Sequence, residues 1–251
     1  MATRRQQRQA LIQRRVIDAV IVKYERAIAR EIQRATIDTL RRLQRDELLA
    51  ADVARNEHSK RLERILNALW VESGEAIGGV MESMKSAARF ERKEFFTAPN
   101  ATMAAANYAR IFSSTKITQI SDTTISDVQA VIAEGIAAGR TEQEIARLVR
   151  SVAPIKSASR AQTIARTESG GASSFVAQSM AELSGVELVR VWVAVTSSDR
   201  TRTDHHEADG QERGMNEPFD VGGEQLMYPS DPNGSAHNVI TCCCQVVYEP
   251  R

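Results

Sequence analysis

The chain has 251 residues, of which 42% are hydrophobic, and its formal net charge at neutral pH is +1. This hydrophobic content is enough to build the core of one or two domains, so the composition excludes a disordered tail. No segment approaches the roughly 20 apolar residues that cross a bilayer, and no signal-type apolar region follows the basic first residues. We therefore expect a cytosolic protein that does not contact membranes.

The charge is distributed unevenly along the chain. Residues 1–45 contain twelve Lys or Arg against four acidic residues, whereas residues 185–251 contain five basic residues against eleven acidic ones. The amino-terminal segment can therefore attract phosphates, in a way that is blind to base sequence. A solvated helical face, or a helix that docks on a partner subunit, would give the same pattern. The candidate contacts to double-stranded DNA are Arg4, Arg5, Arg8, Arg14 and Arg15.

The first third of the chain is predicted to be helical. Apolar residues recur at steps of three and four from about Arg5 to Met84, with no proline among them. This pattern indicates one long helix or a hairpin of two, and the polar residues 56–59 would suit the turn of a hairpin. Glycines at 74, 78 and 79 weaken the helix prediction there, since each costs about 1 kcal/mol relative to alanine.

The middle of the chain is predicted to form further helices, at residues 117–137, 142–152 and 157–183. Thr141 and Glu144 form a T-x-x-E capping box at the start of the second of these helices. We expect Pro154 to mark the end of that helix, because proline lacks the backbone N–H that a helix interior needs. The third helix is expected to end at Gly185, a residue type common just after helices.

The periodicity changes after this helix. Residues 186–195 form a dense β-branched run that predicts a buried strand, and residues 246–248 predict a last strand. The glycines and prolines between them are typical of loops and short hairpins. The fold class is therefore α+β, with a long, mainly helical region before a small loop-rich module. We divide the chain into domains at 1–98, 99–185 and 186–251.

Histidine and cysteine are concentrated in the last module. The three cysteines are consecutive, which suits neither a disulfide framework nor a C-x-x-C chelate. Nitrogen and sulfur ligands nevertheless favour zinc, and a small module gains stability from a bound metal. We expect a structural zinc site formed by His205, His237, Cys242 and Cys244. The alternative is that the cysteines are small buried apolar residues and that His205 is hydrogen-bonded within its loop.

The same module also permits an enzymatic interpretation. His205, His206 and Asp209 could hold a catalytic metal that activates water, as in a metal-dependent hydrolase or a toxin-like enzyme. The sequence contains no H-E-x-x-H motif or other spacing that would place these ligands on one helical face. A polar loop whose side chains bond its own backbone is the simpler interpretation, and we expect no catalytic residue.

Between about residues 140 and 248 the chain carries a set of motif residues, namely Arg166, Thr167, Glu168, Trp192, Asp199, Arg200, Thr201, His205, Gly210, Cys242 and Cys244. In these residues the chain resembles the phage head morphogenesis family, whose best-known member is protein F of phage Mu. Cys243 stands where that family usually has arginine, which removes an ion-pair donor at this position.

The resemblance implies a minor capsid protein of a tailed bacteriophage that acts in procapsid assembly at the portal vertex. The implied partners are the portal protein, the scaffold and the major capsid protein, together with packaged double-stranded DNA that it would accompany at ejection. Its place would be the head interior or portal vertex of the virion, reached from the host cytosol during assembly. Arg166 and Glu168 would either form a solvated pair or fix the orientation of the strand module.

Overall fold

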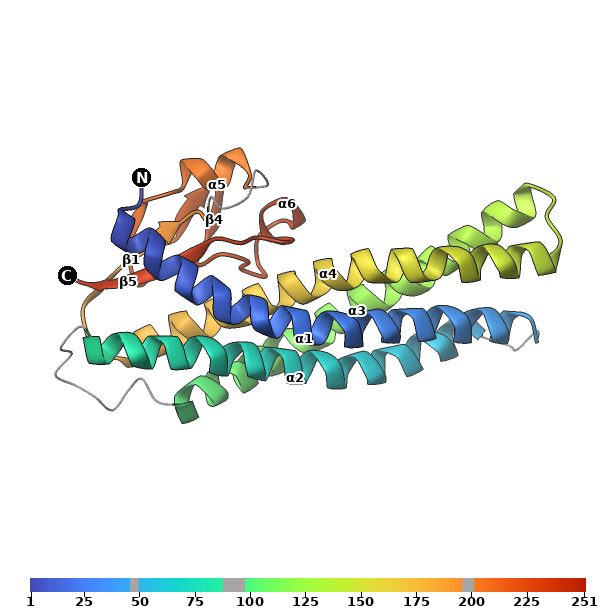
Figure 1. Cartoon of the computed structure of the whole chain (residues 1–251), viewed down its shortest axis with the longest axis horizontal. Coiled ribbons are helices and arrows are strands. Elements are labelled where there is room, and N and C mark those ends of the chain that lie inside the picture. The colour runs from blue at the N-terminus through green and yellow to red at the C-terminus, as the bar shows by residue number, and fades with distance from the viewer. Residues whose placement is uncertain (46–49, 88–97, 196–200) are drawn as a thin grey trace. The chain divides into compact units, whose positions relative to one another are not determined.

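The structure is a computed structural model that describes residues 1–45, 50–87, 98–195 and 201–251. Within this part, four long helices precede a small module of short strands and helices (Figure 1), which confirms the expected α+β fold class. The elements are α1 (Arg4–Leu43), α2 (Ala50–Ala87), α3 (Ala98–Ala137), α4 (Glu142–Leu183), β1 (Leu188–Val193), α5 (Thr203–Glu207), β2 (Glu212–Gly214), β3 (Phe219–Val221), β4 (Glu224–Leu226), α6 (Ala236–Val239) and β5 (Gln245–Pro250).

The turn expected at residues 56–59 is wrong, because these residues lie inside α2. The break comes earlier, between Leu43 and Ala50. His58 is fully buried, and its Nδ1 lies 3.0 Å from Oε1 of Glu31 on α1. The polar residues that suggested a turn thus include one that pairs with a neighbouring helix. The polarity of His58 therefore reflects a buried contact between helices and not a turn at the surface.

Pro154 does not end a helix, which corrects a second expectation. It lies within α4, which continues to Leu183. The buried side of the helix runs past the proline through Val149, Ala153 and Ser157. Packing of this side offsets the one backbone hydrogen bond that proline cannot make.

Other local expectations are confirmed. The N–H of Thr141 donates to Oε2 of Glu144 at 2.8 Å, and the N–H of Glu144 donates to Oγ1 of Thr141 at 3.3 Å, which completes the capping box. Gly185 follows α4 with a φ of +62°, as a glycine after a helix does. The two predicted strands correspond to β1 and β5.

The chain forms two compact units, and the long helices contribute segments to both. The first unit consists of Met1–Val22, Ala68–Arg110 and Arg166–Arg251, and the second of Lys23–Asn67 and Ile111–Ala165. The three-part domain division expected from the sequence stays a prediction. Among the described helices, none combines the length and apolar character required to cross a membrane.

The sheet of the first unit is antiparallel, with the strand order β2-β1-β5. Val191 and Trp192 of β1 lie opposite Val247 and Val246 of β5. Strands β3 and β4 form a separate antiparallel pair. Strand β1 is therefore the central strand of this sheet. It pairs along its whole length with β5, which is distant from it in the sequence.

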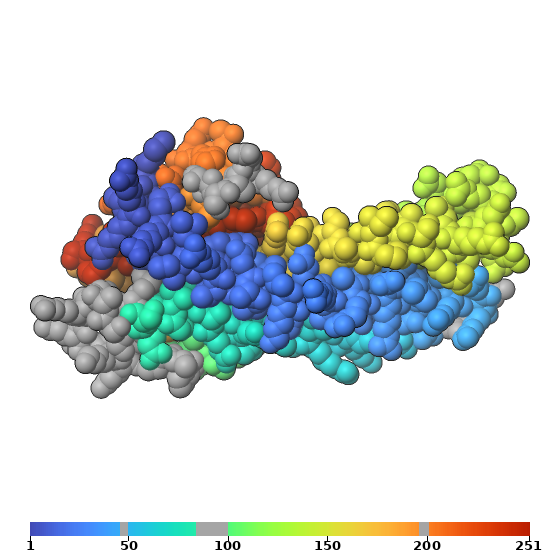
Figure 2. Space-filling model, viewed as in Figure 1, coloured from blue at the N-terminus to red at the C-terminus, as the bar shows by residue number. Residues whose placement is uncertain are grey.

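Both faces of β1 are covered, which explains its continuous apolar sequence. On one face, Val191 and Val193 pack against Ala10 of α1, and the amino-terminal residues, in dark blue, adjoin the red carboxy-terminal residues in Figure 2. On the other face, Leu188 packs against helices of the same unit and Trp192 against the loop-rich part of the module. Because side chains alternate along a strand, two covered faces require apolar residues at nearly every position.

The second unit is built from helical segments around a core that includes Leu40, Val128, Ile145 and Val149. Charged side chains also join its helices. The guanidinium of Arg61 donates to Oε1 of Glu31 at 2.7 Å, beside the contact between that carboxylate and His58. A buried carboxylate with several polar partners fixes how helices align.

Candidate metal centre

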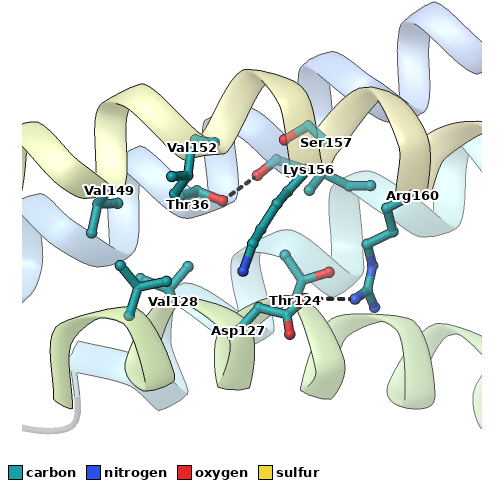
Figure 3. A pocket seen from close by; sticks show the side chains of 12 residues that line it. Thr36, Thr124, Asp127, Val128, Val149, Val152, Lys156, Ser157 and Arg160 are labelled. Atoms are coloured by element: carbon teal, nitrogen blue, oxygen red, sulfur yellow. Dashed lines mark hydrogen bonds and ion pairs between the residues drawn. The ribbon is translucent and has the colours of Figure 1, made fainter. Parts of the chain in front are cut away.

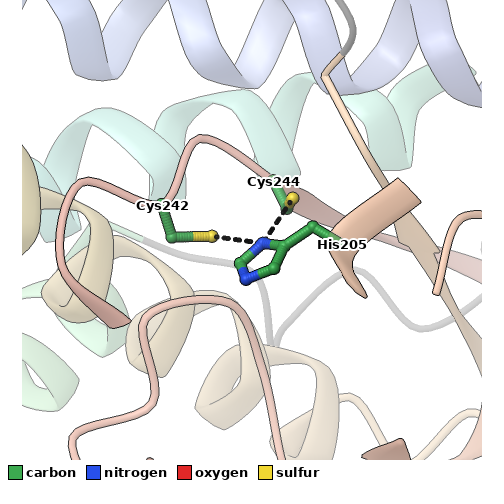
Figure 4. Close-up of side chains that lie close together, drawn as sticks. All are labelled: His205, Cys242 and Cys244. Carbon is green, nitrogen blue, oxygen red and sulfur yellow. Dashed lines mark hydrogen bonds between the residues drawn. The ribbon is translucent and has the colours of Figure 1, made fainter. Parts of the chain in front are cut away.

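One histidine and two cysteines meet in the interior of the first unit. Nδ1 of His205 lies 3.3 Å from Sγ of Cys244 and 3.5 Å from Sγ of Cys242. The three potential ligand atoms lie within 4.8 Å of one another, and all three residues are buried. Figure 4 shows the imidazole directed toward both sulfur atoms. The residues that the sequence analysis singled out at the two ends of the module are therefore brought together.

Two separate pieces of chain hold this cluster. His205 lies on the short helix α5, and its ring packs edge-on against the ring of Trp192 with centroids 5.8 Å apart. The two cysteines lie between α6 and β5, just after Thr241, which has a φ of +56°. The N–H of Thr241 donates to Oγ1 of Thr167 on α4 at 3.0 Å. The strained turn before the cysteines is thus anchored to a helix.

The second ring nitrogen of His205 also has a partner. Nε2 of His205 lies 3.3 Å from Oδ1 of Asn238, and Nδ2 of Asn238 donates to the carbonyl of Val221 at 3.2 Å. The second bond directs the oxygen of Asn238 toward the ring. Nε2 therefore carries the proton, and Nδ1 presents a lone pair to the two sulfur atoms. The sequence analysis missed Asn238, because nothing in its local pattern distinguishes it from an ordinary loop residue.

The two buried thiols differ in their tendency to ionise. The hydrogen bond from Cys244 holds the pKa of the Cys242 thiol well below its usual value, against the effect of burial. The hydrogen bond to Cys242, together with burial, raises the pKa of Cys244. The pair thus favours a state in which Cys242 is ionised before Cys244.

His237 and Cys243 do not join this cluster. Nε2 of His237 lies 3.3 Å from Oδ2 of Asp204, and the His237 side chain is 67% exposed. Sγ of Cys243 lies 3.5 Å from the carbonyl of Thr241, outside the group of ligand atoms. Of the four residues expected to bind zinc, the described structure therefore assembles His205, Cys242 and Cys244.

Residues 126–247 match the family model described as Phage Mu protein F like protein. The chain carries a phage Mu protein F-like region. The suspected resemblance is confirmed, and the matched residues begin within α3 and end within β5. No curated protein and no solved structure matches the chain.

The helical part of the Mu F-like region contributes Arg166, Thr167 and Glu168. Glu168 is buried, and its Oε2 accepts a hydrogen bond from Nε1 of Trp70 on α2 at 3.1 Å. Arg166 is half-buried. Thr167 makes the bond to the cysteine loop described above. Consecutive residues of one helix thus tie α4 to a neighbouring helix and to the loop that carries two members of the cluster.

The loop after β1 contains the remaining motif residues. Asp199 and Arg200 lie outside the described residues, and Oγ1 of Thr201 donates to the carbonyl of Val195 at 3.0 Å. Gly210 has a φ of +82°, and a Cβ atom there would lie within 2.8 Å of the Ala2 nitrogen. Glycine is therefore required at this position on both conformational and steric grounds.

Asp209 has a structural role that the sequence analysis did not predict. Its Oδ1 accepts a hydrogen bond from the N–H of Ala194 at 2.9 Å, and its Oδ2 accepts one from the N–H of Ala2 at 2.9 Å. The carboxylate therefore joins the first residues to the end of β1. His206 is exposed, and neither residue is among the ligand atoms grouped with His205 in the described structure.

The amino-terminal arginines differ in exposure. Arg4, Arg5, Arg8 and Arg15 are exposed on α1. Arg14 is buried and lies 2.6 Å from the carboxylate of Asp18. Four of the five candidate DNA contacts are therefore accessible to a polyanion, and Arg14 is engaged within the helix.

The second unit contains a small cavity between segments of α1, α3 and α4. Its volume is about 30 Å³, and its lining includes Thr36, Thr124 and Val128. Lys156 and Arg160 extend from α4 toward α3 at this place, where Arg160 pairs with Asp127 at 2.8 Å (Figure 3). A space of this size holds about two water molecules and is too small for an organic substrate.

Proposed function

We propose that the protein is a minor structural component of the head of a tailed bacteriophage and acts in head morphogenesis. The observation that carries this proposal is the match of residues 126–247 to the Mu F-like family. The geometry agrees with it, because Trp192, His205, Cys242 and Cys244 gather in one buried cluster within that region. A shared core of this kind is the physical basis on which a sequence motif marks a common fold.

A structural role fits the contacts better than a hydrolytic one does. His205 faces two thiols and an amide, and the carboxylate of Asp209 is engaged by backbone N–H groups. Among the described residues, no carboxylate lies close enough to join His205 and the two cysteines as a ligand. Two of the three residues that the hydrolytic alternative would use, His205 and Asp209, are thus occupied in holding the module together.

The proposal includes a place of action, the portal vertex, where the protein joins the procapsid by contact with portal, scaffold and major capsid proteins. Leu11 and Ile12 on α1 are 38% and 47% exposed, between the exposed Arg8 and Arg15. Apolar side chains flanked by cations form the kind of helical face that docks on another subunit. We assign the docking contact to this face.

Incorporation into particles tests this function. A tagged copy should restore assembly in a phage that lacks the gene and should cosediment with purified procapsids, with the tag at one vertex. Changing Leu11 and Ile12 to Asp should reduce incorporation at least tenfold, whereas Ile155→Asp, at an exposed helical position in the second unit, should not. Absence of the unaltered protein from particles overturns the proposal. Equal incorporation of both variants overturns only the assigned face.

Contact with packaged DNA is a further part of the proposal and has its own test. Replacing Arg4, Arg5, Arg8 and Arg15 with Gln should weaken binding to double-stranded DNA and flatten its dependence on salt. The matched control replaces four exposed cations of the second unit, Lys60, Arg64, Arg147 and Arg150. Fluorescence anisotropy over a salt series measures both. Equal losses in the two variants would mean that binding follows net charge alone and that the amino-terminal arginines form no site.

A further inference from the structure

We propose that His205, Cys242 and Cys244 bind one zinc ion, and that this ion is a structural cross-link within the carboxy-terminal module. The proposal does not depend on a role in phage heads. It differs from the four-residue set expected from the sequence, since it omits His237, which faces Asp204 and is largely exposed.

The spacing of the ligand atoms fits a zinc ion. Zinc binds thiolate sulfur at about 2.3 Å and imidazole nitrogen at about 2.0 Å in tetrahedral geometry, which places nitrogen and sulfur about 3.5 Å apart. The two distances from Nδ1 of His205 are 3.3 Å to Cys244 and 3.5 Å to Cys242. Nδ1 of His205 therefore lies about as far from each sulfur atom as a shared zinc ion requires.

The surroundings prepare the ligands. Oδ1 of Asn238 accepts a hydrogen bond from Nε2–H of His205, which leaves the lone pair of Nδ1 to coordinate the ion. Both cysteines belong to an apolar cluster that includes Trp192 and Phe219. This cluster limits the access of water and oxidants to the sulfur atoms. A partner on the outer nitrogen and an apolar shell are the usual supports of a protein metal site.

The charge of the complex suits a buried place. On binding, each of the two thiols loses its proton to solvent, two Zn–S bonds and one Zn–N bond form, and no group is oxidised or reduced. Two thiolates neutralise the double charge of the ion, so the buried complex carries no net charge.

The position of the ligands in the chain indicates what the ion does. His205 and Cys244 are separated by 39 residues, which include β2, β3, β4 and α6. An ion held at both ends of this segment restricts the unfolded chain and stabilises the folded module. The site is therefore a cross-link in a part of the chain whose strands, β2 to β4, are each only three residues long.

Metal analysis of the purified full chain tests the proposal with matched controls. The unaltered protein should contain one zinc per chain, and a chelator should lower its melting temperature. Cys242→Ser and His205→Gln should reduce zinc to less than a tenth. Cys243→Ser and His237→Gln change a neighbouring cysteine and a nearby histidine outside the cluster, and both variants should retain the full amount.

A second measurement uses only the unaltered protein, so it tests the proposal even if the variants fail to fold. Cobalt added to the reduced, metal-free unaltered protein should give a thiolate charge-transfer band and the intense visible absorption of a tetrahedral site, and zinc should abolish both. The proposal is overturned if the reduced protein binds neither metal, if Cys242 and Cys244 are joined in a disulfide in freshly purified protein, or if His237→Gln loses zinc as fully as His205→Gln. These results do not depend on particle assembly.

Discussion

Arg190 is a fully buried cation at the centre of the first unit, and it is satisfied by neutral groups. Its guanidinium donates to the carbonyls of Gly214, Met227 and Glu217 and to the side chain of Gln178. Burial lowers its pKa, although a guanidinium stays charged at any ordinary pH. The side chain thus holds strand β1, helix α4 and two loops in one arrangement.

We expect Arg190→Lys to destabilise the protein by about 3 kcal/mol, because an ammonium group cannot reach acceptors that are arranged for a planar fork. Urea unfolding followed by circular dichroism measures the change. Arg213→Lys is the matched control on the neighbouring strand β2. Its guanidinium donates to two carbonyls and a side chain within five residues along the chain, and Arg213 is partly exposed, so we expect a loss below about 1 kcal/mol. Equal losses would contradict the role given to Arg190.

At the scale of residues, the sequence predicted which types of ligand form the candidate site more accurately than it predicted which residues belong to it. His205, Cys242 and Cys244 could be predicted, because nitrogen and sulfur ligands are rare and lie at two ends of one module. His237 was indistinguishable from His205 by residue type, and only the fold shows that it faces solvent. Asn238 was not predicted, and neither was the structural role of Asp209, because both roles depend on backbone groups distant in the chain.

At the scale of elements, the glycines of α2 distinguish a packed side of the helix from an open one. A Cβ atom at Gly74 would lie 2.7 Å from Cβ of Ala105 on α3 and 2.9 Å from Val176 on α4. At Gly79 nothing lies within 4 Å of such an atom. Helices α3 and α4 therefore approach α2 closely at Gly74 but not at Gly79.

Alanine substitutions at the two positions should have opposite effects on stability. Gly74→Ala should lower the free energy of unfolding by about 2 kcal/mol, because overpacking exceeds the gain in helix propensity. Gly79→Ala should raise it by about 1 kcal/mol, since only the propensity term acts. Thermal and urea unfolding provide the measurement. Stabilisation by both substitutions would show that the close approach at Gly74 is absent.

Pro154 provides a test of α4. It is exposed, so Pro154→Ala removes no packing and restores an N–H that can bond within the helix. We expect the variant to be more stable by about 2 kcal/mol, whereas Ser159→Ala, at an exposed position further along the same helix, should change stability by about 0.5 kcal/mol or less. A loss of stability in Pro154→Ala would mean that the helix requires the bend that proline introduces.

The types of the main elements were predictable, but several of their boundaries were not. The helix predicted at residues 117–137, for example, begins at Ala98. The capping box and the glycine after α4 are local signals, and both predictions were confirmed. The turn at residues 56–59 and the helix end at Pro154 were inferred from residues that disfavour helices in isolation. In each case burial of a helical side against other helices outweighs the local preference.

At the scale of the whole molecule, the first unit joins segments from distant parts of the chain. Ala10 of α1 packs against Val191, Val193 and Val247, and Gln6 donates to the carboxylate of Glu249 at 2.9 Å. Sequence patterns showed that α1 is amphipathic and that β1 is buried. They could not show that α1 and β1 contact each other, because an apolar pattern does not specify which apolar surface it packs against.

Changing one residue of α1 should therefore loosen strands at the far end of the chain. Ala10→Asp places a charge at a fully buried position against the sheet and should destabilise the unit by about 2 kcal/mol or more. Hydrogen exchange should then accelerate in β1 and β5. Arg8→Asp, an exposed position on the same turn, should leave these amides protected. Unchanged exchange in Ala10→Asp would show that α1 does not cover the sheet.

The contact between α1 and β5 also determines when α1 can finish packing during protein synthesis. The ribosome releases the early residues of α1 long before Gln245–Pro250, yet the sheet needs both. Until β5 has been translated, the sheet against which the apolar side of the first turns of α1 packs is incomplete. Contacts between residues far apart in the sequence slow folding, and intermediates with exposed apolar surface are prone to aggregation. The first turns of α1 can therefore complete their packing only after β5 has been synthesised.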